Sequence, residues 1–399
     1  MTDAEATRPG ITPEGEACAP ILPRGLRREP HGVDELATEH LIVNMGPQHP
    51  STHGVLHILL EVDGEEIIAA EASLGYLHRG IEKLAEHRRY NAVGTLLDRA
   101  DYLSGIHTEL AFAMAAEQLA EIEVPRKARW LRSLFSEVTR ISSHVLWLGS
   151  AAIDVGAMAP FLYIMRDREA LVDVLESVTG ARMMFNYVRP GGVLADLTPD
   201  AEPKLRAFLK TFPMYLEEYH ELLTGNEIFQ ARLKSVGVID RDTALGFGLS
   251  GPPLRASGFD WDIRRDRPYA AYSELDLEIP VGSHGDSWDR YLVRMEELRI
   301  SAGLITQCLD GMPEGDVIAK VPKVLRPPAG EAYAAVESPR GEVGIHVISD
   351  GSDKPYRMHL RAPSLMNLSV IDEVLPGHKI ADAVAIIGSL DIVLGEIDR

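Results

Sequence analysis

Residues 125–148 read PRKARWLRSLFSEVTRISSHVLWL, and this stretch predicts a long helix at the centre of the fold. Pro125 suits the start of a helix, where the missing backbone N–H leaves no intrahelical bond unmade. Apolar residues then recur at steps of three and four, namely Leu131, Leu134, Phe135, Val138, Ile141, Val145 and Leu148. A continuous apolar stripe of this kind is typical of a helix packed in a core.

The segments on either side of this helix predict the rest of the fold. Further helices are expected at residues 106–122, 166–179, 198–225 and 286–309. A period of two indicates strands at residues 41–43, 57–62, 66–72, 331–337, 341–349 and 356–361. Asp63-Gly64 and Asp350-Gly351 are strong hairpin signals. The prediction is an α+β fold, a helical core with antiparallel β-sheet elements from the N- and C-terminal parts.

Four regions are expected along the chain. Residues 1–40 lack periodicity and are rich in Pro, Gly and charge, which favours a flexible N-terminal extension. Residues 41–75 form an N-terminal β region that includes a polar loop, and residues 76–325 form the helical core. Residues 326–399 are interpreted as a C-terminal β-rich region that ends in a buried tail.

Composition excludes several classes of function. The 399 residues hold 40 Lys+Arg against 60 Asp+Glu, a formal charge of −20, so a nucleic-acid partner is not expected. Two cysteines, Cys18 and Cys308, are too few to ligate an iron–sulfur cluster. Neither GxGxxG nor GxxxxGK[ST] occurs, so no nucleotide site is indicated. No segment is as long and apolar as a membrane span or a signal peptide, which favours a cytosolic chain that meets a membrane only through partners.

The densest polar segment is residues 44–57, NMGPQHPSTHGVLH. His49, His53 and His57 are four residues apart, but a zinc site would rest on this spacing alone, because the prolines argue against a helix. A loop between two strands that holds imidazoles at the mouth of a pocket is the better interpretation. A capped turn with hydrogen-bonded histidines remains the structural alternative.

Several unusual segments follow one another in a fixed order. They are NMGPQHPSTHG (44–54), GYLHRGIEK (75–83), RADYL (99–103), ESPRGE (337–342), SDG (349–351), PYR (355–357), RAPS (361–364) and GEIDR (395–399). From about residue 40 to residue 399 the chain thereby resembles the family of D subunits of bacterial respiratory complex I, the NADH–quinone oxidoreductase. The first segment is long and unusual enough to be highly specific.

The resemblance implies a fold similar to the large subunit of nickel–iron hydrogenases and a translocase subunit that is active only within its complex. It implies that His53 and Tyr102 bind the quinone headgroup and that Asp154 pairs with His53. The substrate would be ubiquinone or menaquinone, and this chain would bind no metal or nucleotide. The cleft would lie against a neighbouring subunit that carries a [4Fe–4S] cluster, with Arg99 near that cluster.

The resemblance also implies neighbours and a location. The expected partners are other complex I subunits, namely the iron–sulfur B subunit, the C subunit, the membrane-embedded H subunit and the ferredoxin-like I subunit. The chain would lie peripherally on the cytoplasmic side of a bacterial cell membrane.

The residue types suit quinone reduction, which takes up two electrons and two protons. Histidine can take up a proton near neutral pH, particularly beside a carboxylate such as Asp154, which favours the charged form. Tyr102 has an ordinary pKa of about 10 and remains an O–H donor. Two such donors at opposite carbonyl oxygens would orient the ring and act as general acids.

Three alternatives to this interpretation are considered. A nickel–iron hydrogenase large subunit would need two CxxC pairs, and the sequence contains none. The chain could serve a related hydrogenase- or ferredoxin-linked complex as its quinone-site subunit. A scaffold paralogue that lost the chemistry is the third, and the joint presence of His53, Tyr102 and Asp154 argues against it.

Overall fold

The predicted central helix is α4, Arg126–Asp154, in the computed structural model of the chain, which describes residues 40–47 and 55–399. All seven residues of its predicted apolar stripe are buried. Glu137, Arg140 and His144 of the same helix are also fully buried, so α4 is enclosed on more than its apolar face. This arrangement requires the neighbouring elements to supply partners for its charges.

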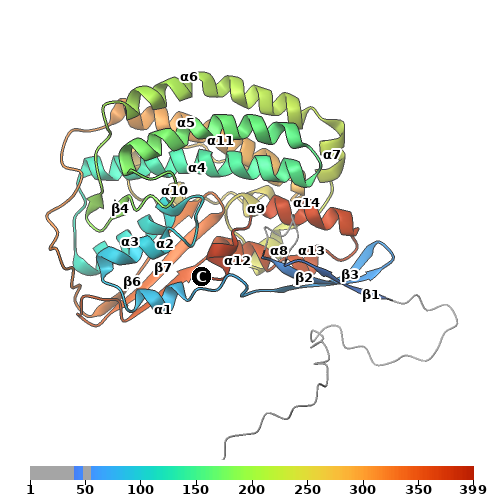
Figure 1. The fold of residues 1–399 in the computed structure, drawn as a ribbon, viewed down its shortest axis with the longest axis horizontal. Helices are drawn as coiled ribbons and strands as arrows, with labels where there is room; N and C mark the ends of the chain where they lie inside the picture. Colours follow the sequence, from blue (N-terminus) through green and yellow to red (C-terminus); the bar gives the residue numbers. More distant parts are fainter. Residues whose placement is uncertain (1–39, 48–54) are drawn as a thin grey trace, which may run out of the picture. The chain divides into compact units, whose positions relative to one another are not determined.

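Three other long helices form a layer with α4. They are α5 (Met158–Thr179), α6 (Ala201–Tyr219) and α11 (Ser287–Gly311) (Figure 1). Helices α5 and α11 pack on α4, and α6 packs on α5 and α11. Asp286 caps α11 by accepting a hydrogen bond from the Asp289 N–H at 2.8 Å. Helix α5 begins eight residues before the predicted start, because Pro160 falls in its first turn, where no intrahelical N–H bond is lost.

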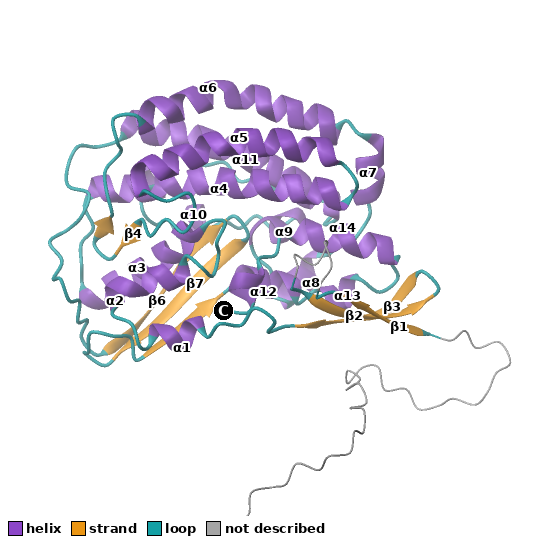
Figure 2. Cartoon of the chain, viewed as in Figure 1, coloured by secondary structure: helices purple, strands orange, loops and turns teal. Residues whose placement is uncertain are grey.

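The C-terminal part supplies a three-stranded antiparallel sheet. Its strands are β6 (Gly330–Ser338), β7 (Gly341–Ser349) and β8 (Arg357–Arg361), in that order. The register pairs Glu337 with Glu342 and Ile345 with Leu360. Helix α3 (Gly105–Ala120) lies along this sheet, and its buried apolar residues belong to the same core as those of α4 (Figure 2).

The N-terminal sheet packs around a second core. Strands β1 (Leu41–Met45), β2 (His57–Asp63) and β3 (Glu66–Ser73) pair antiparallel in the order β1-β2-β3. Ile58, Leu60 and Val62 alternate inward, as the period of two predicts, and join apolar residues of the C-terminal helices. The Ile67 N–H donates to the carbonyl of His378 at 2.9 Å, which fixes β3 to the C-terminal part.

The predicted α+β class is confirmed, but the end of the chain differs from the prediction. After β8 the chain is helical rather than β-rich, with α12 (Pro363–Leu368), α13 (Ile371–Val374), α14 (Ile380–Leu390) and α15 (Leu394–Ile397). Helices of this length are marginal by themselves and depend on tertiary packing, so their sequences carry no long periodic pattern.

The other short elements likewise depend on tertiary packing for their stability. They are α1 (Ile81–Ala85), α2 (Tyr90–Leu97), β4 (Val188–Arg189), β5 (Gly192–Val193), η2 (His220–Thr224), α7 (Glu227–Leu233), α8 (Arg241–Gly246), α9 (Gly251–Ala256), α10 (Ile263–Asp266) and η3 (Tyr272–Glu274). Residues 39–399 form one compact unit. The predicted extension, residues 1–40, falls outside the described residues except for its last residue. No helix of the described residues has the length and apolar character needed to cross a bilayer.

Candidate functional site

Tyr102 lies in the turn between α2 and α3, and the side chain of Asp101 shapes this turn. Asp101 Oδ1 accepts hydrogen bonds from the backbone N–H groups of Leu103 and Ser104, both at 3.1 Å. Asp101 Oδ2 accepts a bond from the Ser104 hydroxyl and pairs with Arg340 Nη1 at 2.9 Å. Because Asp101 and Arg340 are fully buried, the turn is anchored firmly to the β6–β7 hairpin.

The half-buried ring of Tyr102 packs against the last helix of the chain. A Cβ atom at Gly395 in α15 would lie 3.2 Å from Tyr102 Cε1 and 2.6 Å from the carbonyl oxygen of Ala100. These distances leave no room for a side chain at residue 395. Glycine therefore permits the close approach that positions Tyr102.

Burial raises the pKa of the Tyr102 phenol above its ordinary value. The positive charges of Arg340 and Arg79 oppose this rise, whereas the negative charges of Asp101 and Glu396 add to it. The phenol consequently keeps its proton at neutral pH.

Asp154 is the last residue of α4 and lies beside α14. A Cβ atom at Gly388 would lie 3.3 Å from Asp154 Oδ2, so the carboxylate touches the C-terminal part of the chain. Trp147, on the same helix, donates its indole N–H to the Gly388 carbonyl at 2.7 Å and fixes α14 against α4. The C-terminal segment therefore contacts both Asp154, through Gly388, and Tyr102, through Gly395.

Arg99 has an exposed side chain, in contrast to Asp98 and Ala100 on either side of it. Its Nη1 lies 3.2 Å from the Met184 sulfur, and its carbonyl oxygen accepts a hydrogen bond from Arg79 Nη2. Exposure on the turn that precedes Tyr102 leaves this guanidinium accessible to a neighbouring protein. The role of Arg99 beside a partner's cluster stays a prediction.

The polar loop is described only at its two ends. His53, like His49, lies in residues 48–54, outside the described residues, so neither the pairing of His53 with Asp154 nor its approach to Tyr102 is defined. His57 opens β2, where its Nε2 lies 2.9 Å from Asn44 Oδ1 and its ring meets the edge of Tyr76. Within residues 40–47 and 55–399, no cluster of metal-ligating side chains occurs.

Asp398 and Arg399 bind the segment that follows β3 through hydrogen bonds and an ion pair. Asp398 Oδ1 accepts a hydrogen bond from the Gly75 N–H at 2.8 Å, and Asp398 Oδ2 accepts one from the Leu77 N–H at 2.6 Å. The Asp398 carbonyl oxygen lies 2.6 Å from His78 Nδ1. The last residue of the chain continues this contact, because Arg399 Nε pairs with Glu82 Oε1 at 3.0 Å.

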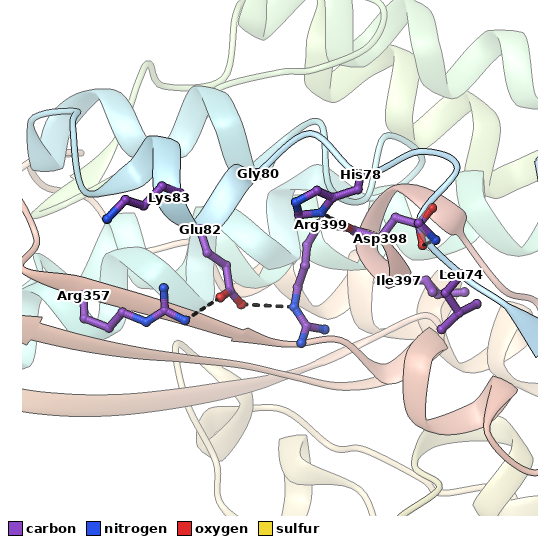
Figure 3. Close-up of a pocket in the computed structure, with 10 residues that line it drawn as sticks. Leu74, His78, Gly80, Glu82, Lys83, Arg357, Ile397, Asp398 and Arg399 are labelled. Atoms are coloured by element: carbon purple, nitrogen blue, oxygen red, sulfur yellow. Dashed lines mark hydrogen bonds and ion pairs between the residues drawn. The ribbon is translucent and has the colours of Figure 1, made fainter. Parts of the chain in front are cut away.

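Figure 3 shows this contact at the edge of a cavity of about 470 Å³. Glu82 projects between Arg357 and Arg399, with Glu82 Oε2 3.0 Å from Arg357 Nη2. His78 and Asp398 lie at the opposite side of Arg399. We call residues 398–399 with their partners in residues 75–82 the tail clasp. It ties the segment that carries Arg79 to the helix that carries Gly395.

Replacing Asp398 with alanine is expected to loosen the tail clasp. Two backbone N–H groups lose a charged acceptor, which costs about 1–3 kcal/mol of local stability. Hydrogen exchange of the Gly75 and Leu77 amides in the purified assembly should therefore accelerate about tenfold or more. Asp316→Ala, at an exposed position, is the matched control and should leave these amides unchanged. Unchanged exchange in the Asp398 variant would contradict the clasp.

A buried cluster of charged residues near Tyr102 was not among the predicted site residues. Arg340 pairs with Asp101 and approaches Asp391 Oδ1 at 3.8 Å, and Glu396 is fully buried in α15. The sequence analysis did not single out Asp391 or Glu396. One signal could have found them, namely the presence of two carboxylates within the otherwise apolar run from Leu390 to Ile397.

Comparison with known proteins assigns the chain to a family. The family model described as the 49 kDa subunit of respiratory-chain NADH dehydrogenase matches residues 154–399. The D 2 subunit of NADH-quinone oxidoreductase from Solibacter usitatus is 47% identical over 91% of this chain and 98% of its own length. The D subunit of the same enzyme from Clostridium beijerinckii is 48% identical over 92% of this chain and 99% of its own length. The chain belongs to the family of 49 kDa subunits of respiratory-chain NADH dehydrogenase.

Membership in the 49 kDa subunit family confirms the resemblance predicted from the ordered motifs and makes the chain a subunit of a respiratory-chain NADH dehydrogenase. The family model begins at Asp154, so it spans Arg340, Glu396 and the end of the chain but not Arg99 or Tyr102. The individual roles of His53, Tyr102, Asp154 and Arg99 stay predictions.

Proposed function

We propose that this chain is the quinone-binding subunit of its NADH–quinone oxidoreductase and supplies proton donors to the quinone from His53 and Tyr102. The observation that carries the proposal is the setting of Tyr102. Its turn is anchored to Arg340, its ring is held against Gly395, and its phenol keeps a proton at neutral pH. A rigid neutral donor of this kind suits a quinone oxygen, on which negative charge develops during reduction.

Asp154 would orient and charge the His53 imidazole. A carboxylate beside an imidazole favours the protonated ring, which is the form that donates to a quinone carbonyl. Asp154 is the last residue of α4, and its carboxylate lies against Gly388 of α14. The support for this pairing is the family resemblance together with that position.

Electrons would reach the quinone from a [4Fe–4S] cluster in a neighbouring iron–sulfur protein of the complex. This chain has two cysteines, and burial inside α11 raises the pKa of the Cys308 thiol. The donor set of this chain therefore does not suit a cluster, which needs four thiolates. The exposed guanidinium of Arg99 would face the partner's cluster and favour its reduced, more negative form.

The proposal includes the neighbours of this chain in the complex. The B subunit would carry the cluster, and the C, H and I subunits would be the other contacts, with the membrane-embedded H subunit linking the chain to the cytoplasmic face of the membrane. The substrate would be ubiquinone or menaquinone. The helical layer with its two three-stranded antiparallel sheets supports the proposed relation to the nickel–iron hydrogenase large subunit.

The test is to introduce His53→Ala and Tyr102→Phe separately into the assembled complex. Each should lower quinone reductase activity by about tenfold or more, because a positioned acid contributes roughly 10²–10⁴-fold to such a step. Oxidation of NADH by an artificial acceptor that bypasses the quinone site should be unchanged. Tyr356→Phe, at a tyrosine that is 65% exposed, is the matched control.

Wild-type quinone reduction in both variants would overturn the assignment. Labelling with a photoreactive quinone analogue separates the remaining alternative. A scaffold subunit should show no label that excess quinone displaces, whereas the proposed site should be labelled and protected. Identification of the co-purifying proteins distinguishes an NADH-linked complex from a hydrogenase- or ferredoxin-linked one.

A further inference from the structure

Glu396 has two oxygens in different environments. Its Oε1 accepts hydrogen bonds from the Ser364 N–H, at 3.0 Å, and from the Ser364 hydroxyl. That hydroxyl accepts a bond from the Val393 N–H at 3.1 Å, which directs its proton toward Glu396. Glu396 Oε2 is buried and has no hydrogen-bond partner among the described residues. A proton on Glu396 would therefore lie on Oε2, because Oε1 already accepts two donors.

The charges around Glu396 do not balance when every group is ionised. Asp101, Asp391 and Glu396 supply three negative charges, and the buried Arg340 and Arg294 supply two positive charges. Arg340 pairs with Asp101 at 2.9 Å and approaches Asp391 at 3.8 Å, and Arg294 approaches Asp391 at 3.9 Å.

Glu396 makes no ion pair within the described part of the chain. An unpaired buried charge is costly, so neutralisation by one proton is the stable arrangement, and Glu396 is the carboxyl that needs it.

The ionisation of these carboxyls agrees with the geometry. Burial raises the pKa of Glu396 to about 7, with Asp101 adding to the rise and Arg340 opposing it. Burial raises the pKa of Asp391 to about 6 against the opposing charges of Arg340 and Arg294. Near neutral pH the cluster therefore holds an exchangeable proton, with Glu396 as its main site.

From this geometry we propose that Glu396 is a proton store for the quinone site and returns a proton to Tyr102 after Tyr102 has protonated the quinone. The Tyr102 O–H bond breaks as its proton passes to the reduced quinone oxygen, which leaves a phenolate. Because Glu396 Oε2 has no direct hydrogen-bond partner among the described residues, its proton reaches the phenolate through a bridging water. The Oε2–H bond breaks as the water takes that proton and gives one of its own to the phenolate, leaving a carboxylate near Arg340. No electron passes through either residue, because the partner's cluster supplies both.

The contact of the neighbouring residue, Gly395, with Tyr102 places Glu396 near the donor. Glu396 follows Gly395, whose backbone packs on the Tyr102 ring. The charge of Glu396 also acts on the Tyr102 phenol, since it contributes to the raised pKa of Tyr102. The inference rests on the proposed role of Tyr102, and Glu396 acts through that residue rather than on the quinone.

The first test is Glu396→Gln in the assembled complex, with quinone reduction measured from pH 6 to pH 8.5. Wild-type activity should fall as the pH rises through about 7, because the store empties. The glutamine variant cannot give up a proton, so its rate at pH 6 should be about fivefold lower and should lack this descending limb. At pH 8.5 the two rates should agree within about twofold. Glu331→Gln, at a carboxylate that is 71% exposed, is the matched control.

A second variant, Ser364→Ala, should shift the pH profile in a defined direction. Ser364→Ala removes the hydroxyl donor to Oε1, which stabilises the Glu396 carboxylate and lowers its pKa. The descending limb should then move to higher pH by about half a unit to one unit. A wild-type pH profile in Glu396→Gln, or a shift to lower pH in Ser364→Ala, would overturn the proposal.

Infrared spectroscopy of the wild-type complex keeps the inference testable if Glu396→Gln fails to assemble. With isotope-labelled glutamate carboxyl groups, the band of a protonated carboxyl group should disappear with a midpoint near pH 7. In Ser364→Ala this midpoint should move to higher pH. Absence of that band would overturn the proposal. The Tyr102→Phe variant separates failure of the proposed function from failure of the proton store. Wild-type activity in Tyr102→Phe would reject the proposed function. Reduced activity in Tyr102→Phe together with a wild-type pH profile in Glu396→Gln would reject only the proton store.

Discussion

Gly395→Ala should lower quinone reductase activity by about tenfold or more while the complex still assembles. The new Cβ atom would lie 2.6 Å from the Ala100 carbonyl oxygen and 3.2 Å from Tyr102 Cε1. Both neighbours belong to the turn that carries the proposed donor, so the turn or the last helix must shift. A displacement of about 1 Å at a reacting group can cost roughly a hundredfold in rate.

The measurement is the turnover of the assembled complex with quinone and, separately, with an artificial acceptor that bypasses the quinone site. Gly303→Ala is the matched control, because Gly303 is exposed within α11 and an added Cβ there meets nothing within 4 Å. Alanine at that position should leave turnover unchanged and stabilise the helix by about 0.5–1 kcal/mol. Full activity in the Gly395 variant would show that the contact with Tyr102 does not position it.

Glu137→Gln is expected to destabilise the helical core by about 3–5 kcal/mol. The buried carboxylate pairs with Arg140 at 3.2 Å and with Arg264 at 3.2 Å. It also accepts hydrogen bonds from the hydroxyls of Tyr272 and Ser301, both at 2.6 Å. Glutamine keeps one acceptor oxygen but leaves two buried guanidinium groups without their shared countercharge.

The same residue gives a pH dependence with a defined sign. Burial by itself would raise the pKa of Glu137, but Arg140 and Arg264 outweigh it and lower the pKa to about 2 from 4.5. A carboxylate whose pKa is lowered by folding stabilises the fold at pH values above the pKa that it has in the unfolded chain. This contribution of roughly 3 kcal/mol is lost as the pH falls from 4.5 toward 2. The stability difference between the wild-type and Glu137→Gln proteins should therefore shrink over that interval.

Hydrogen exchange of the α4 and α11 amides in the purified complex measures this difference. Glu217→Gln is the matched control, because Glu217 is an exposed helical glutamate and its replacement should change stability by less than about 0.5 kcal/mol. Equal exchange in both variants at pH 7 would contradict the assigned role of the Glu137 ion pairs.

The regular elements were predictable because their signals are local. The strands of the two three-stranded sheets and the two Asp-Gly hairpins follow from a period of two and from turn chemistry, and the central helix follows from its apolar stripe. The α12–α15 helices were missed because each is too short to show a period and is stabilised by the residues packed against it. The charged side of α4 was also missed, since its partners Arg264 and Ser301 lie more than a hundred residues away.

The sequence by itself determined the α+β class, the family and the chemistry of the candidate donors, because residue type, local period and motif order are properties of the chain alone. It named Tyr102 and Asp154, but nothing near either residue in the sequence indicates that both contact the C-terminal segment. Only the tertiary structure placed Gly395 against the Tyr102 ring, Asp398 on the backbone of Gly75 and Leu77, and Glu396 in a buried cluster short of positive charge. Such contacts depend on burial and charge balance among distant residues, which arise only when the chain folds.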